Sequence, residues 1–208
     1  MNSMRAGIAL ACLWLVPLAG NAEAAGTDAA PTVNAVWVEK EVAFTYFGFT
    51  TYYSCDGLRD KLRWVLQQVG ARPGFKVRVT GCVGQGPDLM PRATITAALP
   101  QEATPELLAR LAEDASRADL VARATGKGFE QGEATAQFAA RPRRVEFRER
   151  ASSRIEDGDC ELVEHLRDKV FVPLGAKVLE NDMRCTPKAV SLGGVRLTIE
   201  VLEPVPTP

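Results

Sequence analysis

The feature that most constrains this chain is a stretch that occurs twice in the same order. Each copy has a cysteine, an apolar helical pattern, a glycine, a short apolar strand and a second cysteine, at residues 55–82 and 160–185. The glycine follows the first cysteine by 15 residues in both copies, as Gly70 and Gly175. A further apolar strand follows each second cysteine. This shared order predicts an internal duplication, which sets the architecture of the fold.

Each copy, together with the strand before it and the strand after it, predicts a β-α-β-β unit. The first helix has the clearest pattern, because its apolar residues form one continuous stripe: Leu58, Leu62, Val65, Leu66 and Val69. Thr104 and Pro105 open a second helix in the first unit, and residues 119–124 predict a further short strand. The resulting order, β-α-β-β-α-β, is that of a ferredoxin-like sandwich. We therefore expect an α+β protein of two related β-α-β-β units (a ferredoxin-like α/β sandwich), each closed by one disulfide.

Residues 1–24 predict a signal peptide. Arg5 supplies the positive start, residues 8–18 form an apolar run, and Ala22-Glu23-Ala24 is a cleavage site of small residues. The run is shorter than the roughly 20 residues that span a bilayer, so we expect cleavage and no stable membrane anchor. The predicted organisation is a signal peptide at 1–24, a linker at 25–34, a first α+β unit at 35–128, a second at 129–204 and a proline-rich tail at 205–208.

Four cysteines follow the export signal: Cys55, Cys82, Cys160 and Cys185. In an exported chain they predict two disulfides. The duplication favours the pairs Cys55–Cys82 and Cys160–Cys185, because equivalent residues of two copies should pair alike. The alternative is a four-thiolate zinc site, which needs closely spaced Cys-x2–4-Cys pairs, and none is present. We expect no metal, and a periplasmic or secreted location.

Charge and composition exclude several partners. The net charge is −1, and 46 % of residues are hydrophobic and 25 % charged, as in an ordinary folded protein. Nothing points to a nucleic acid. Six arginines cluster at residues 141–154. They predict either a site for an acidic polymer or, as we favour, a solvated strand face paired with acids at residues 156–164.

Few residues suggest catalysis. The single histidine, His165, lies on or beside the polar face of a predicted helix, with nothing visible to orient it. No hydrolase or protease motif occurs. The glycine clusters at 81–86 and 126–128 are interpreted as turns, because no helix follows them to bind a phosphate. We assign no catalytic residue and no cofactor.

An aromatic segment carries the strongest functional hint. Its members are Tyr46, Phe47, Phe49, Tyr52 and Tyr53. Tyrosine and other aromatic side chains give large contact areas at low entropic cost, which favours a binding surface. The alternative is a core strand, since apolar residues from 44 to 49 occupy both of its faces. We expect Gly48, Tyr52 and Tyr53 to be the residues of this segment least needed for packing.

The block Phe44-Thr45-Tyr46-Phe47-Gly48-Phe49-Thr50-Thr51-Tyr52-Tyr53-Ser54-Cys55-Asp56-Gly57-Leu58 resembles one found in uncharacterised exported proteins of proteobacteria. The resemblance covers about the first third of the chain after the export signal. It implies a Gram-negative periplasmic setting and no named activity.

The leading hypothesis is an exported, non-catalytic envelope protein that binds another protein or an extended polymer through the aromatic segment. The alternative is a periplasmic enzyme that acts on an envelope substrate. Its active site would be a cleft between the two units, with His165, Asp56 or Glu164 as the acid or base. A third hypothesis is an accessory domain with inert faces. An exposed aromatic patch would favour binding, and a cleft with convergent polar groups would favour the enzyme.

Overall fold

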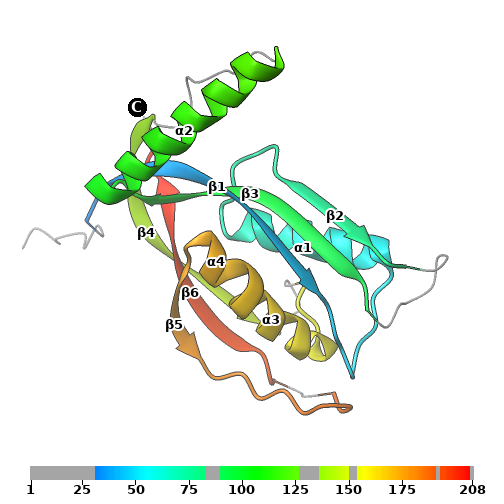
Figure 1. Ribbon diagram of the computed structural model, residues 1–208. Helices are drawn as coiled ribbons and strands as arrows, with labels where there is room; N and C mark the ends of the chain where they lie inside the picture. The colour runs from blue at the N-terminus through cyan, green and yellow to red at the C-terminus, as the bar shows by residue number, and fades with distance from the viewer. Residues whose placement is uncertain (1–30, 83–89, 127–135, 150–153, 191–192, 207–208) are drawn as a thin grey trace, which may run out of the picture.

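The computed structural model describes residues 31–82, 90–126, 136–149, 154–190 and 193–206. The predicted signal peptide, most of the linker, and the predicted boundary between units at 128/129 lie outside these residues. The described residues form an antiparallel sheet with helices packed against it (Figure 1). The α+β class is therefore confirmed.

The strands are β1 (Val33–Thr45), β2 (Lys76–Thr80), β3 (Arg92–Glu102), β4 (Gln137–Arg148), β5 (Lys177–Asn181) and β6 (Arg196–Pro204). The helical segments are α1 (Cys55–Gln68), α2 (Pro105–Thr125), the 3₁₀ turn η1 (Asp157–Asp159), α3 (Cys160–Leu166), the π-helical turn η2 (Arg167–Phe171) and α4 (Val172–Leu174). β1 thus begins two residues inside the predicted linker.

The sheet has the strand order β2-β3-β1-β4-β6-β5. Its two halves have the same internal order, because the strands from one edge to the centre are β2-β3-β1 and from the other edge to the centre are β5-β6-β4. The two first strands meet in the middle over only four residues each, Val33–Val36 against Gln137–Ala140. Beyond Ala140, β4 is therefore paired on one side only, which accommodates Pro142 within a strand.

The residues of the main core come from both halves of this sheet. Residues directly opposite each other in antiparallel strands point to the same face, so each side contributes one apolar row across three strands: Val42, Ile95 and Val77, and Val145, Ile199 and Val178. The predicted stripe of α1 is buried throughout against this core. Ser54 caps the helix by accepting from the Gly57 N–H, and Gly70 follows its end with φ +74°.

The helices of the second half lie on strands of the first. Lys40 Nζ on β1 donates to Pro173 O at 2.8 Å, and Gln101 Nε2 on β3 donates to Leu174 O at 3.0 Å. In the other direction, Trp64 of α1 packs edge-on against Phe147 of β4, with ring centroids 6.4 Å apart. The two halves therefore interlock across the sheet instead of forming separate sandwiches.

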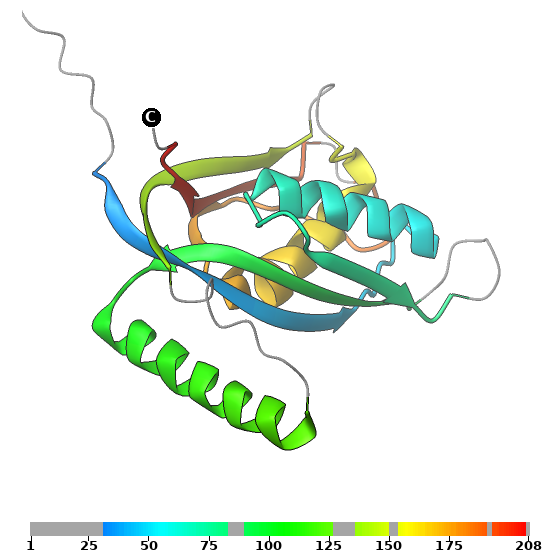
Figure 2. The ribbon, with the colours of Figure 1, turned by 90° about the horizontal axis from the view of Figure 1, so that it is seen from above.

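The predicted strand at residues 119–124 is wrong. These residues belong to α2, which starts at the predicted cap Thr104 and ends at Gly126 with φ +66°. Ion pairs at i,i+4, from Arg117 to Glu113 and from Arg123 to Asp119, support the helix along its surface. Only Leu107 of α2 is buried, and most of the helix extends away from the sheet (Figure 2).

Both predicted disulfides are present. Cys55–Cys82 and Cys160–Cys185 each join the first residue of a helix, α1 or α3, to the segment after the next strand, β2 or β5. At the far end of the chain, Val205 N–H donates to Ala139 O at 2.8 Å, so the predicted tail begins with a residue attached to β4.

Candidate functional site

The structure divides the predicted aromatic segment into core and surface residues. β1 ends at Thr45, so the segment is a connection between β1 and α1 and not a strand covered on both sides. Tyr46 and Tyr53 are buried in the main core, whereas Phe47, Phe49 and Tyr52 are 50, 57 and 45 % exposed. The expectation that Tyr53 contributes little to packing is therefore wrong.

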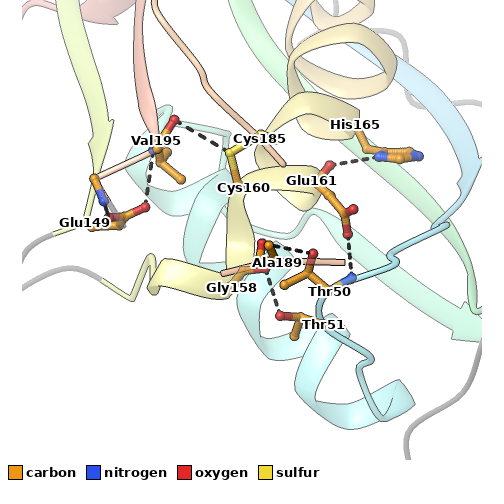
Figure 3. Close-up of a disulfide and its surroundings, with 12 residues drawn as sticks. Thr50, Thr51, Glu149, Gly158, Cys160, Glu161, His165, Cys185, Ala189 and Val195 are labelled. Carbon is orange, nitrogen blue, oxygen red and sulfur yellow. Dashed lines mark hydrogen bonds between the residues drawn. A yellow bond between two sulfur atoms is a disulfide. The ribbon is translucent and has the colours of Figure 1, made fainter. Parts of the chain in front are cut away.

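The backbone of this connection is held by the opposite half of the molecule (Figure 3). One carboxylate oxygen of Glu161 accepts from Phe49 N–H at 2.7 Å and from Thr50 N–H at 3.0 Å. Thr51 Oγ1 donates to Gly158 O at 2.8 Å. Because Glu161 is only 7 % exposed, these are charge-assisted bonds with little competition from water. They fix the conformation in which the neighbouring aromatic side chains point outwards.

Two glycines, Gly48 and Gly158, leave room for the close packing of Tyr46 and Thr51 in this connection. A Cβ on Gly48 would lie 2.0 Å from Tyr46 Oη and 2.4 Å from Thr51 O, the two groups that hydrogen-bond to each other at 2.9 Å. A Cβ on Gly158 would lie 2.2 Å from Thr51 Oγ1. Either side chain would disrupt the anchored connection.

Beneath the connection lies His165, which is half-buried. Its Nδ1 lies 2.8 Å from Glu161 O, so Nδ1 carries the proton and donates to that carbonyl. Its ring packs edge-on against Tyr46, with centroids 5.6 Å apart, and lies tilted by 36° against the ring of Phe44, with centroids 6.4 Å apart. These contacts support the packing of the connection on α3.

A buried carboxylate joins the same region to α1. Asp159 is 1 % exposed and accepts from Tyr53 Oη, from Lys61 Nζ at 2.5 Å and from Glu156 N–H at 2.8 Å. Burial, together with the negative charge and hydrogen bond of Asp159, raises the pKa of Tyr53 above its usual range. Burial and the nearby Glu161 likewise raise the pKa of Tyr46. Both tyrosines are therefore neutral donors at physiological pH.

Two further exposed apolar residues lie next to residues that bond to this connection. Met90 precedes Pro91, whose carbonyl accepts from Tyr46 N–H at 2.9 Å, and Val190 follows Ala189, whose carbonyl accepts from Thr50 Oγ1 at 3.4 Å. Met90 is 54 % and Val190 59 % exposed. We name these five exposed residues, Phe47, Phe49, Tyr52, Met90 and Val190, the aromatic tip.

The residues considered for catalysis do not converge on a cavity. Asp56 is exposed at the start of α1 and pairs with Arg59 at 2.5 Å. His165 is held by a carbonyl, and no bond of the Glu164 side chain is seen within the described residues. None of these three residues lines the cavity beside α2 or the cavity beside the end of α1.

The arginine cluster forms a paired strand face, but with other partners than expected. Arg141 and Arg143 both pair with Glu203 on β6, and Arg148 pairs with Glu146 on its own strand. The acids at residues 156–161 are used elsewhere, in η1 and α3. Arg150 lies outside the described residues. Three of the six arginines are thus paired within the sheet, and such exposed pairs contribute little to stability.

Sequence reasoning missed the two buried acids, Asp159 and Glu161. They flank Cys160 as Ser54 and Asp56 flank Cys55. The Asp159 carboxylate accepts from Glu156, Tyr53 and Lys61. The duplication gave no signal for their burial, because the equivalent Asp56 is exposed at the start of α1.

Comparison of the chain with family models, with curated proteins and with solved structures finds no match. Within the described ranges, no helix is long and apolar enough to cross a membrane, and no group of histidine, cysteine and acidic side chains is arranged to hold a metal ion. The two disulfides indicate an oxidising, extracytoplasmic compartment.

Proposed function

We propose that this protein is exported to the periplasm and binds another protein or an extended envelope polymer through the aromatic tip, without catalysis. The observation that carries the proposal is the contrast within one short connection. Its backbone is held by a buried carboxylate, yet Phe47, Phe49 and Tyr52 face solvent. Side chains of this size are buried when they serve only the core.

The rigid backbone favours binding. Association is opposed by the loss of conformational freedom at the contact surface, roughly 0.5–1.5 kcal/mol for each side chain that becomes ordered. Here Glu161 and Gly158 already fix the positions from which the aromatic side chains project. Aromatic residues also have few rotatable bonds, so they bury a large area with a small entropic loss.

We also infer that the two halves are related β-α-β-β units that arose by duplication. The matching strand orders on the two sides of the sheet support this inference, as do disulfides that join equivalent elements. Only one aromatic tip results, because the connection between β4 and α3 lacks the aromatic residues of the first copy. Binding would therefore have evolved in one copy, with the second copy providing its support.

The proposal can be tested by site-specific photo-crosslinking in the periplasm of a Gram-negative host. A photoreactive residue at Phe49 is expected to give a defined crosslinked product, which disappears when Phe47→Ser and Tyr52→Ser are added. The matched control carries the photoreactive residue at Leu120 of α2, which is similarly exposed at 62 % and lies outside the aromatic tip. Equal crosslinking from both positions, or persistence of the product in the double substitution, would rule out this surface as the binding site.

A further inference from the structure

A second feature lies away from the aromatic tip. An open cavity of about 520 Å³ is lined by the first turns of α2, the end of β3, the glycine after α4, and the strands β5 and β6. Its volume is within the range of small-molecule sites, about 300–1,000 Å³. Both halves of the chain contribute to its walls.

The cavity has an apolar floor and a wall shaped by a glycine. Leu107 and Val201 are buried residues of the lining. Gly175 has φ +99°, and a Cβ there would lie 2.6 Å from Gln101 Nε2. Gln101 instead donates to Leu174 O at 3.0 Å, which joins the end of α4 to β3. The wall is therefore built by specific contacts and does not depend on a loose loop.

One unpaired positive group lines this cavity. Arg110, two turns into α2, forms no ion pair or hydrogen bond with any residue that the structure describes. Its charge adds to that of Lys40, whose Nζ donates to Pro173 O at 2.8 Å. Burial and the nearby charge of Arg110 lower the pKa of Lys40.

Two negative groups of the lining are also unpaired. Glu102 ends β3 and Glu106 lies in the first turn of α2, and neither forms an ion pair within the described ranges. The other two charged residues of the lining, Lys177 and Glu200, form an ion pair with 3.8 Å between Lys177 Nζ and Glu200 Oε1. The cavity thus keeps opposite charges that do not neutralise each other, although both line the same space.

We propose that this cavity binds a small zwitterion, an apolar amino acid or short peptide with free termini. The ligand carboxylate pairs with the Arg110 guanidinium, whose planar donors suit a carboxylate. The ligand ammonium lies between Glu102 and Glu106. The apolar side chains pack on Leu107 and Val201. This site is independent of the aromatic tip, and it needs no catalytic group.

The test uses the dipeptide leucyl-leucine as the probe, with isothermal titration calorimetry on the full mature chain. We expect the natural protein to bind leucyl-leucine. The Arg110→Gln variant should bind it at least about tenfold more weakly, because one charge-assisted pair is lost. Leucyl-leucinamide lacks the carboxylate, so its weaker binding should not change in Arg110→Gln. The double variant Glu102→Gln/Glu106→Gln should weaken leucyl-leucine but not N-acetyl-leucyl-leucine.

Arg117→Gln is the matched control, because Arg117 lies on the same helix, outside the cavity lining, and pairs with Glu113 at 2.5 Å. It should bind leucyl-leucine as the natural protein does. The proposal is overturned if leucyl-leucine shows no binding at millimolar concentration. It is also overturned if the doubly blocked N-acetyl-leucyl-leucinamide binds equally well, or if Arg110→Gln and Arg117→Gln behave alike.

Discussion

At the scale of single residues, the Asp159 carboxylate explains why Tyr53 is buried next to an exposed aromatic residue. A carboxylate that is 1 % exposed needs donors on all sides, because an uncompensated buried charge is strongly destabilising. Tyr53 supplies one donor from the connection before α1, and Lys61 supplies another from α1 itself. Tyr52, one residue earlier, makes no such contact and is free to face solvent.

This difference predicts unequal effects of the same substitution at neighbouring positions. Tyr53→Phe removes a donor from buried Asp159 and should lower the free energy of unfolding by about 1–3 kcal/mol. Tyr52→Phe should change it by no more than about 0.5 kcal/mol. Urea denaturation at neutral pH measures both. Equal effects of the two substitutions would contradict the assignment of Tyr53 to the Asp159 network.

At the scale of elements, the β1–α1 connection depends on a partner more than a hundred residues away. Glu161 on α3 holds the backbone of Phe49 and Thr50, so the exposed aromatics have their conformation fixed from the second half of the chain. The connection is thereby more rigid than its exposure suggests. Its rigidity is the property on which the proposed binding depends.

Amide hydrogen exchange tests this anchoring directly. Glu161→Ala leaves the two N–H groups without their acceptor, so exchange at Phe49 and Thr50 should accelerate at least about tenfold, as expected for the loss of about 1.4 kcal/mol or more. Glu164→Ala, less than one turn further along α3, makes no comparable bond and serves as the control. Unchanged exchange at Phe49 in Glu161→Ala would show that the connection is held by other contacts.

Local patterns predicted the elements well where one helix or strand supplied the whole signal. The stripe from Leu58 to Val69 and the cap at Thr104 follow from spacing within one segment, whereas the disulfide pairs follow from the match between the two copies. Residues 119–124 were misassigned because Leu120 and Val121 suggest a strand, although ion pairs along α2 support a helix. The anchoring of Phe49 by Glu161 could not be predicted, since nothing in the sequence places these residues together.

At the scale of the whole molecule, the two halves share one sheet and one main core. α1 packs against β4 through Trp64 and Phe147, and the end of α4 is bonded to β1 and β3. The Lys61–Asp159 ion pair adds a buried polar link between them. Such interlocking makes each half depend on the other for burial of its helix, so the halves should unfold together.

The disulfides provide the test of this cooperativity. Cys160→Ser/Cys185→Ser opens a loop of sequence separation 25, and Cys55→Ser/Cys82→Ser opens one of 27. In the chain-entropy model each double variant loses about 3–4 kcal/mol of stability, and the two losses should be nearly equal. Far-UV circular dichroism and tryptophan fluorescence should report one coincident transition for either variant, because the core spans both halves. Two separate transitions, with only the half that lost its disulfide melting early, would show instead that the halves are independent units joined edge to edge.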